Sequence, residues 1–512
     1  MHHTIVSLIL SFFFLNISPL CAQDATTQKT ATEPAKVPSG DINGFDVVKK
    51  EHSLSLNDKN LPYESLTGTL TLKGDDGKEK ANIFFTAYFL KDVPPGSRPI
   101  TFCFNGGPGS ASLWLHMGLL GPKKVIIKDA TYNAPPGRYE DNPYTLLDSS
   151  DLVFVDPVST GFSTAAEGVD AKQFHGVEED ITSIAEFIRH FVTKFDRWGS
   201  PKFLLGESYG TIRVVGLAEK LSEKYYMNIN GLALVSACLD LQALGFDSSN
   251  DLSYILTLPS ITAAAQYHKK IAPDLQAKKL QELLAEVEEF ALGEYASALL
   301  MGDTLPEAKK QDIAVKLARY TGLSADYVMQ SALRIRSYRY YKELLRSENK
   351  LLGWFDTRIT GLDQNQVSEF ASYDPSLTAV ASNFASAYLQ YVNQELDWKK
   401  ERPYYVINPS VNPWNWGCTG LPAGMGYLNL TDQLKSAIIK NPALSVFIGS
   451  GYYDLVTPYF STDYTVDHLQ LPPGLQNNVE RHYYEAGHMM YTHLPSLVQM
   501  KKDLSEFIQK SS

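Results

Sequence analysis

The stretch Phe203-Leu204-Leu205-Gly206-Glu207-Ser208-Tyr209-Gly210-Thr211 joins an apolar run to a Gly-x-Ser-x-Gly pentapeptide. The apolar run is typical of a buried strand, and residues 213–224 after it are compatible with a helix. The pentapeptide alone is a weak signal, because Gly and Ser are common in ordinary loops. In a sharp strand-to-helix turn, however, the backbone crowds the serine, and only small residues fit two positions before and after it. The flanks therefore favour a nucleophile elbow that lifts the Ser208 hydroxyl clear of a sheet, at a helix N-terminus that favours developing negative charge.

The composition is that of a globular protein with an ample core. The chain has 512 residues, of which 44% are hydrophobic and 20% are charged. Length alone suggests about three domains, but single α/β domains often run well past about 200 residues and accept insertions, so we expect two structural units. The formal net charge is -11 and the chain has no basic run, which argues against a nucleic-acid partner.

The N-terminus contains an apolar stretch, residues 5–15, that is too short to span a bilayer comfortably. It predicts a signal peptide over residues 1–22, and hence a secreted or periplasmic protein with no membrane span after signal removal. Residues 23–40 lack periodicity and predict a flexible linker. Two alternatives are a lipoprotein anchored at Cys21, which the bulky Leu20 disfavours, and an uncleaved membrane anchor.

The cysteines indicate neither a disulfide framework nor a metal site. Removing the leader leaves Cys103, Cys238 and Cys418, so at most one bridge can form. Their isolated spacing offers no Cys-x-x-Cys ligand pair, and we expect no metal. Buried free thiols are the favoured interpretation.

Strand and helix patterns alternate in the first half of the chain. Two β-rich runs, 67–73 and 81–90, flank Gly74-Asp75-Asp76-Gly77 and predict a hairpin. A helix is predicted between the strand 151–156 and the elbow strand, which makes a parallel crossover unit. The other predicted elements are strands at 99–104, 230–238, 444–448 and 479–484 and helices at 178–195 and 494–510.

Between about residues 252 and 398 the pattern changes to long helices with almost no strand signal. The predicted helices cover residues 277–292, 306–319, 324–348 and 376–395. We therefore expect an α/β core over residues 41–245 and 430–512, with a helical cap insertion over 246–429. Long insertions at loop ends of such cores usually shape the substrate entrance.

A glycine-rich loop, Asn105-Gly106-Gly107-Pro108-Gly109-Ser110, follows the strand 99–104 directly. Asn-Gly is common in hairpin turns, so one interpretation of this loop is a simple turn. Two adjacent glycines, a proline and a third glycine are more than a turn needs. Free backbone N–H groups after a buried strand can instead make an oxyanion pocket.

A base and an acid for Ser208 are expected near the C-terminus. A serine hydroxyl needs a base to remove its proton, and the base needs an acceptor that holds its tautomer. Gly449-Ser450-Gly451-Tyr452-Tyr453-Asp454 follows one strand, and Glu485-Ala486-Gly487-His488-Met489 follows the last one. Asp463 and Asp467 are rival acids. His488 alone follows a strand through a glycine close to the final helix, so Ser208, Asp454 and His488 are the candidate triad.

These motifs together resemble those of the serine carboxypeptidases over roughly residues 60–510. The resemblance implies an α/β-hydrolase fold, with a mostly parallel central sheet and a helical cap insertion. It also implies hydrolysis of C-terminal residues from peptides through an acyl-enzyme intermediate, with no cofactor. The substrate would be a peptide with a free C-terminal carboxylate.

The same resemblance implies a role for each motif residue. Ser208 would be the nucleophile, His488 the base and Asp454 its orienting acid. The backbone N–H groups of Gly107 and Tyr209 would form the oxyanion hole. The substrate's carboxylate and the leaving residue would be contacted by Asn105, Gly106, Glu207 and Met489.

Two positions depart from the family pattern. Cys103 stands where many members have tryptophan, which affects the expected shape of the leaving-residue pocket. Leu119 stands where a second glutamate would partner Glu207. An esterase or acyltransferase on the same scaffold is the main alternative function, because fold and triad are shared by several activities. A non-catalytic peptide-binding protein is disfavoured by the intact triad, and the oligomeric state is left open.

Overall fold

The computed structural model describes residues 40–41, 45–56, 58–94, 96–417 and 426–512. The predicted signal peptide, nearly all of the predicted linker, and Cys418 lie outside the described residues. Within the described part, every helix is too short or too polar to serve as a bilayer-crossing segment.

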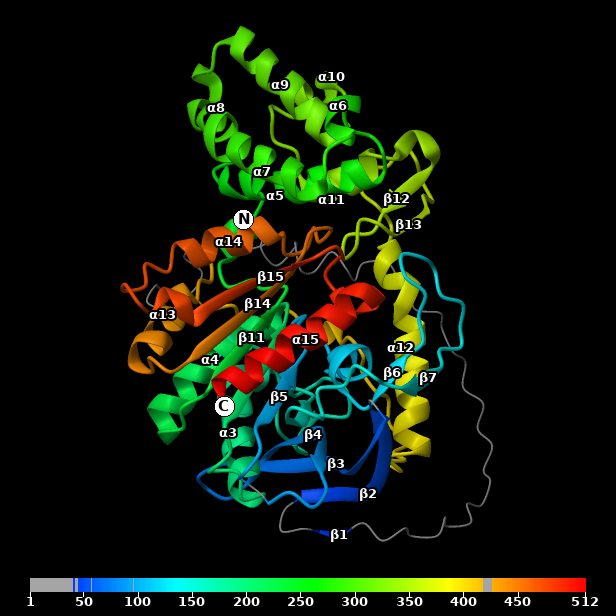
Figure 1. The fold of residues 1–512 in the computed structure, drawn as a ribbon, viewed down its shortest axis with the longest axis vertical. Helices are drawn as coiled ribbons and strands as arrows, with labels where there is room; N and C mark the ends of the chain where they lie inside the picture. Colours follow the sequence, from blue (N-terminus) through cyan, green and yellow to red (C-terminus); the bar gives the residue numbers. More distant parts are fainter. Residues whose placement is uncertain (1–39, 42–44, 57, 95, 418–425) are drawn as a thin grey trace.

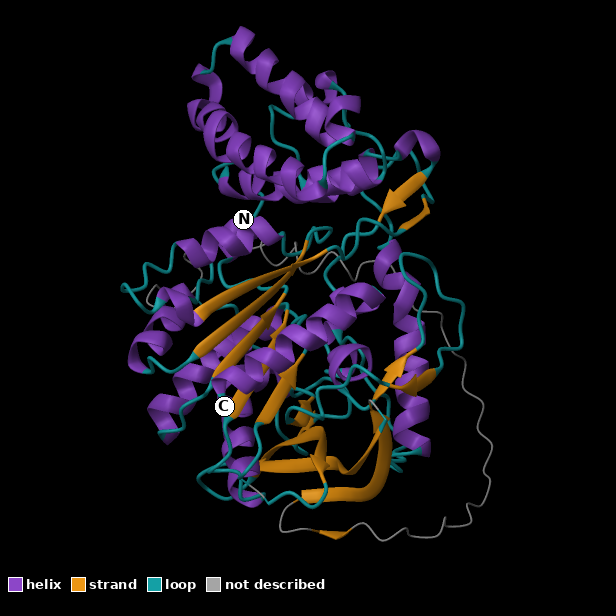
Figure 2. Ribbon diagram, in the orientation of Figure 1, coloured by secondary structure: helices purple, strands orange, loops and turns teal. Residues whose placement is uncertain are grey.

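One eleven-stranded sheet forms the centre of the molecule (Figures 1 and 2). Its strands lie in the order β1-β2-β3-β4-β8-β5-β10-β11-β14-β15, and β9 pairs with β4. The strands up to β4 are antiparallel, and β4 is antiparallel to β8, whereas all pairs from β8 to β15 are parallel. The strands are β1 Gly40–Asp41, β2 Phe45–Leu56, β3 Lys59–Lys73, β4 Glu79–Leu90, β5 Ile100–Phe104, β8 Asp151–Val155, β9 Thr164–Ala165, β10 Lys202–Glu207, β11 Gly231–Val235, β14 Ser445–Gly451 and β15 Val479–Tyr484.

The predicted hairpin and the predicted parallel strands are confirmed. The hairpin is β3 and β4, and β3 is longer than its pattern because it also pairs along its length with β2. β8 and β10 lie on either side of β5 and are connected through α3, as the crossover unit predicts. The result is a mostly parallel α/β-hydrolase sheet. The candidate site residues follow the carboxyl ends of its parallel strands.

Helices cover both faces of the sheet, and the alternation of side chains along each strand decides which cluster a residue joins. In β5, Phe102 and Phe104 pack into one apolar cluster, whereas Cys103 between them packs into the other. Figure 1 shows α15 in front of the sheet and α3 and α4 behind it. The first cluster contains side chains of α3 Val177–Lys194, α4 Tyr209–Tyr225, α13 Thr431–Lys440 and α14 Tyr459–Asp467, and the second contains side chains of α2 Leu113–Leu115, α12 Pro375–Gln394 and α15 Leu494–Ser511.

A separate group of helices lies at the top of Figure 1 and has its own apolar cluster. It follows β11 in the chain, and its buried side chains include those of α5, α7 and α9, which contact one another. Its helices are α5 Leu252–Tyr267, α6 Pro273–Gln276, α7 Leu280–Phe290, α8 Ala296–Met301, α9 Glu307–Thr321, α10 Ala325–Gln330 and α11 Ser337–Glu343.

One predicted helix in this region is wrong. The segment 324–348 forms two short helices, α10 and α11, because Ala332 and Leu333 between them adopt left-handed backbone angles with φ of 51° and 64°. Neither residue is a glycine or proline, so the sequence gives no breaker signal there. The predicted helical region also contains two short strands, β12 Lys350–Leu352 and β13 Thr360–Leu362, which form an antiparallel pair.

Helix α12 lies inside the predicted insertion 246–429 but packs differently from the helices before it. Its buried side chains, including Phe384 and Tyr388, join the cluster under the sheet rather than the cluster of α5 to α11. It also contacts the small hairpin of β6 Lys123–Val125 and β7 Tyr139–Asp141. The insertion boundaries stay a prediction, and the packing divides the segment into a separate helical part and a part attached to the core.

Candidate active site

The elbow at Ser208 has the strained geometry that its sequence predicts. Ser208 has φ 59° and ψ -129°, directly between β10 and α4, and its N–H donates to the Val235 carbonyl over 2.9 Å. A Cβ on Gly206 would lie 2.2 Å from the Gly210 oxygen, and one on Gly210 would lie 2.6 Å from the Phe104 oxygen. Both distances are too short for any side chain, which explains why glycine stands on either side of the serine.

His488 and Asp454 form a buried pair at the ends of β15 and β14. His488 Nδ1 lies 2.6 Å from Asp454 Oδ2, and the two side chains are 1% and 0% exposed. Asp454 Oδ1 accepts from the N–H groups of Val456 and Thr457, and Oδ2 accepts from the Thr457 hydroxyl over 2.7 Å. These donors fix the carboxylate, so the histidine ring is held with Nδ1 toward Asp454.

The other ring nitrogen of His488 is left free for chemistry. Nε2 is buried and has no hydrogen-bond partner among the described residues. The backbone is tied on both sides, since His488 N–H donates to the Phe355 carbonyl and the Ser236 hydroxyl donates to the His488 carbonyl over 2.8 Å. Burial alone would lower the pKa of His488, but the charge and hydrogen bond of Asp454, joined by the charge of Glu207, hold that pKa above its usual value.

The glycine loop lies directly against the elbow. A Cβ on Gly106 would lie 2.6 Å from the backbone nitrogen of Tyr209, so the two backbones are in contact. Gly107 has φ 105°, a conformation that favours glycine. Tyr209 is the first residue of α4, and the first N–H groups of a helix have no partner within it. The backbone N–H groups expected to form the oxyanion hole therefore belong to two segments that meet beside Ser208.

Asn105 is fixed at the end of β5 by contacts on both sides. Its Oδ1 accepts from the Leu115 N–H over 3.0 Å, which turns the amide donor away from that helix. Its carbonyl accepts from Arg213 over 2.7 Å, and Arg213 forms a fully buried ion pair of 2.8 Å with Asp180. Asn105 is 2% exposed, so it is a rigid and almost fully desolvated donor.

Glu207 is a buried residue, and one of its carboxyl oxygens is available to a ligand. It is 4% exposed, and its Oε2 has no hydrogen-bond partner among the described residues. Burial raises the pKa of Glu207 to about 7, although the nearby His488 and Tyr491 act to lower it. Such a group carries its proton at mildly acidic pH and can then donate to an incoming carboxylate.

Two further residues near the site were not found from the sequence. Tyr491, three positions after His488, is 3% exposed and lies beside both Glu207 and Asn105. Thr457 contacts both members of the acid–base pair, with its hydroxyl 3.2 Å from His488 Nδ1. The only available signal was their closeness in sequence to His488 and Asp454. Met489, which sequence reasoning did name, is 8% exposed and its carbonyl is fixed by Thr492.

A segment after α12 runs along the glycine loop and the elbow. Ser110 forms a bridge with Ile407, and the Asn408 N–H donates to the Gly109 carbonyl over 2.8 Å. Farther along, Trp414 and Trp416 lie edge-on to the Tyr209 ring, with centroids 5.5 and 5.9 Å away. This part of the predicted insertion therefore borders the site.

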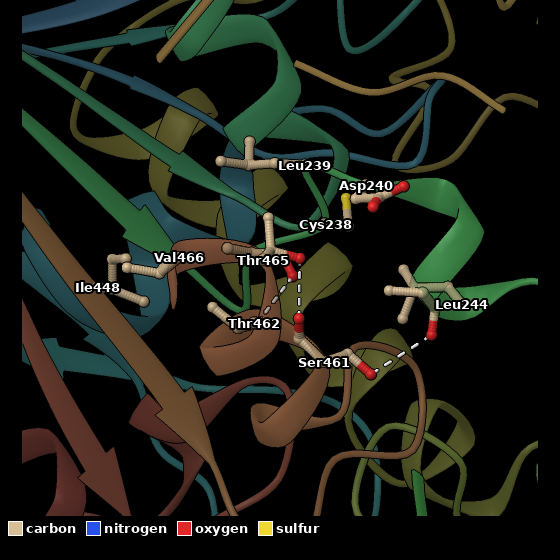
Figure 3. Close-up of a pocket in the computed structure, with 11 residues that line it drawn as sticks. Cys238, Leu239, Asp240, Leu244, Ile448, Ser461, Thr462, Thr465 and Val466 are labelled. Carbon is tan, nitrogen blue, oxygen red and sulfur yellow. Dashed lines mark hydrogen bonds between the residues drawn. The ribbon is translucent and has the colours of Figure 1, made fainter. Parts of the chain in front are cut away.

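A small recess lies near the elbow, lined by Ile448 of β14, by residues of α14 and by the segment 237–244 that follows β11 (Figure 3). Cys238 borders it, and its backbone N–H is held by the Thr211 hydroxyl over 3.2 Å. The hydroxyls of Ser461 and Thr462 donate to the carbonyls of Ala243 and Ala237. The polar groups on its wall are thus already paired. Cys103 and Cys238 are both buried free thiols, as predicted, and burial raises the pKa of each.

Comparison with known proteins decides the family. The family model described as "Serine carboxypeptidase" matches residues 57–498, which is most of the chain. The chain belongs to the serine carboxypeptidase family. Among curated members, serine carboxypeptidase-like 38 of Arabidopsis thaliana is 27% identical over 43% of this chain and 46% of its own length. A probable serine carboxypeptidase of Arthroderma benhamiae is 25% identical over 52% of this chain and 53% of its own length.

The matched segments span about half the length of these serine carboxypeptidase relatives. The crystal structure of Kex1(Δ)p, described as a prohormone-processing carboxypeptidase from Saccharomyces cerevisiae, superposes with a TM-score of 0.52. It covers 88% of this chain and 91% of its own, at 15% identity, and so shows a common fold. Among the described residues, no group of three or more His, Cys, Asp or Glu side chains is placed to hold a metal ion.

Proposed function

We propose that the protein is a serine-type carboxypeptidase that releases C-terminal residues from peptides. The observation that carries this proposal is the Glu207 carboxyl group, buried with a free Oε2 next to Asn105 and adjacent in sequence to Ser208. A buried polar group without a partner is costly unless a ligand completes it. A peptide carboxylate, placed there, has its last peptide bond within reach of the serine.

Catalysis would follow the acyl-enzyme route. Ser208 Oγ attacks the carbonyl carbon of the scissile bond, and its proton passes to Nε2 of His488. The N–H groups of Gly107 and Tyr209 would donate hydrogen bonds to the carbonyl oxygen as negative charge develops on it. His488 then gives the proton to the leaving amine, and the C–N bond breaks. Water, deprotonated by the same nitrogen, attacks the ester and restores Ser208.

Asp454 supports each of these steps without changing its own protonation. Its contact with Nδ1 holds the tautomer that leaves Nε2 as the base and stabilises the imidazolium that forms. Asn105, the Gly106 N–H and protonated Glu207 would together hold the substrate's carboxylate, with Met489 near the leaving residue. The site residues supply every group that this route needs, and no cofactor enters it.

The decisive experiment compares a short blocked peptide with its C-terminally amidated twin. A carboxypeptidase releases the last residue of the free acid, and cleaves the amide much more slowly because Asn105 and Glu207 are left unpaired, at about 1–3 kcal/mol per group. Mass spectrometry of the products reports which bond is cut. Equal rates on both substrates, or cleavage of simple esters only, would assign the site to an esterase or acyltransferase instead.

The cellular location follows from the N-terminal segment rather than from the site. We propose that residues 1–22 direct export and that the mature protein is secreted or periplasmic. Determining the N-terminal residue of the protein from its native source tests this. An intact Met1 would overturn export by cleavage, and a lipid on Cys21 would favour the lipoprotein.

A further inference from the structure

Tyr491 has a buried hydroxyl group that makes no hydrogen bond of ordinary geometry within the described part of the chain. Its side chain is 3% exposed, and no donor or acceptor among the described residues meets hydrogen-bond geometry with the phenol oxygen. Two other buried tyrosines, by contrast, have paired hydroxyls: Tyr295 donates to the Leu333 carbonyl and Tyr340 to the Ile261 carbonyl. An unpaired buried hydroxyl costs about 1–3 kcal/mol, so its presence calls for an explanation.

The hydroxyl lies beside two other polar groups that are poised for a ligand. Glu207 and Asn105 are close enough to act on the pKa of Tyr491, and Oε2 of Glu207 is likewise unpaired. The three groups are thus near enough to act on one another, yet the phenol oxygen and Glu207 Oε2 each lack a hydrogen bond of ordinary geometry among the described residues. An acceptor placed between them would complete both, and the Asn105 amide lies beside the same position.

The position of the phenol ring is fixed by the protein backbone. A Cβ on Gly118 would lie 2.4 Å from two ring carbons of Tyr491, so the ring rests directly on that glycine. The neighbouring Leu119 is fully buried in the apolar cluster under the sheet and supplies no polar group. Tyr491 therefore places a hydroxyl group at the border of this apolar cluster, beside Glu207 and Asn105.

We propose that the Tyr491 hydroxyl donates a hydrogen bond to the C-terminal carboxylate of the peptide substrate, beside Asn105 and Glu207. This inference rests on the proposed carboxypeptidase function and adds a residue that determines its specificity for a free carboxylate. A carboxylate has two oxygens with about four acceptor positions, enough for Asn105, Gly106, Glu207 and Tyr491 together.

This donor differs from Glu207 in its response to pH. Burial and the charge of Glu207 raise the pKa of Tyr491 well above its usual value, so the phenol keeps its proton throughout the working range. The groups whose charges or hydrogen bonds act on Glu207 are His488, Tyr491, Asp454 and Asn105. Above the pKa of Glu207, Tyr491 and Asn105 remain as donors, so part of the preference for free acids persists in the wild type.

The test measures KM and kcat of Tyr491→Phe on a blocked free-acid peptide and on its amide. We expect KM for the free acid to rise about tenfold, the change that loss of one charge-assisted hydrogen bond brings, and rates on the amide to stay within about twofold of wild type. Tyr391→Phe is the matched control, because it removes another buried phenol hydroxyl, one that bonds Tyr88 over 2.9 Å. It should leave the free-acid preference unchanged.

Binding of the free-acid peptide to Ser208→Ala, with and without Tyr491→Phe, gives a readout independent of turnover. Calorimetry should show that Tyr491→Phe lowers the affinity for the peptide by a larger factor at pH 8.5 than below the pKa of Glu207, because Glu207 no longer donates a hydrogen bond at pH 8.5. If Tyr491→Phe does not fold, Gly118→Ala displaces the ring while keeping the hydroxyl and should lower the same affinity.

The outcomes separate this inference from the function on which it rests. A wild type that treats acid and amide alike overturns the proposed carboxypeptidase, and the role of Tyr491 with it. A wild type that prefers the acid, together with a Tyr491→Phe variant that keeps the whole preference, overturns the role of Tyr491 alone.

Discussion

The Cα of Gly106 and the backbone nitrogen of Tyr209 approach each other so closely that a methyl group on Gly106 would lie 2.6 Å from that nitrogen. The contact sets the distance between the glycine loop and the elbow. Gly106→Ala should push the Tyr209 N–H away and lower kcat about 10²- to 10³-fold, the usual effect of losing one oxyanion donor. Initial rates together with a thermal melt measure this. Gly293→Ala, where a methyl group meets nothing within 4 Å, is the control and should leave kcat unchanged.

Ser208 should be the residue that reacts with a fluorophosphonate. Ser208 is a half-buried residue at the elbow, whereas the neighbouring β10 residues are buried. Ser208→Ala should reduce turnover by several orders of magnitude, since members of a triad act as one unit. Peptide mapping of the labelled protein locates the adduct. An adduct on any other serine contradicts the assignment.

Chelation should leave the activity intact. The proposed route uses only side-chain and backbone groups of this chain, and we predict that incubation with EDTA changes kcat/KM by less than about twofold. A matched incubation without chelator is the control. Inhibition that zinc reverses would show that the route is incomplete.

Peptide binding should weaken as pH rises through about 7. Glu207 donates to a carboxylate only when protonated, and burial raises the pKa of Glu207 to about 7. His488 must be neutral to act as a base. Its raised pKa therefore shifts the acidic limb of the kcat profile to higher pH. A plot of kcat/KM against pH should be bell-shaped, and its two apparent pKa values describe the coupled groups together rather than single residues.

Glu207→Gln tests the alkaline side of this bell, because glutamine donates at every pH. Its KM should stay flat above pH 7 while the wild-type KM rises, and its acid limb should remain. Single-turnover rates show whether KM reports binding. Parallel curves for the two proteins would leave Glu207 only the role of bracing the elbow.

The same substitution should stabilise the fold at alkaline pH. The folded-state pKa of Glu207 lies above its usual value of 4.5, so the folded protein binds this proton more tightly than the unfolded chain. The resulting penalty is absent below pH 4.5, grows up to about pH 7 and is then constant at roughly 3 kcal/mol. Glu207→Gln should therefore raise Tm relative to wild type at pH 8 and not at pH 4. An equal difference at both pH values would contradict the buried ionisation.

The parts of this structure that were predicted from sequence are those set by local patterns. The buried runs at 99–104 and 203–207 became β5 and β10, and the elbow glycines act through the backbone atoms next to them. The contacts that escaped prediction join residues distant in the chain. Tyr491 lies beside Glu207 and has its ring against Gly118, and no periodicity in the sequence encodes either contact.

The predicted continuous helix over residues 324–348 was wrong for a related reason. The left-handed pair Ala332 and Leu333 divides a segment whose composition favours a continuous helix, and packing within the cluster of α5 to α11 overrides that preference. Similarly, the raised pKa of Glu207 depends on how completely folding buries it. Leu119 offers no second carboxyl group to raise the pKa of Glu207, and burial raises it instead.

The sheet order also governs when the protein can become active during its synthesis. The proposed nucleophile, Ser208, directly follows β10 in the middle of the sheet, whereas the proposed acid and base follow β14 and β15, the last two strands to leave the ribosome. A nascent chain that has been translated through α12 already carries Ser208 but has no base to activate it. The proposed triad is therefore complete only after β15 has been synthesised and has paired with β14, so Ser208 is not activated in a chain that is still growing.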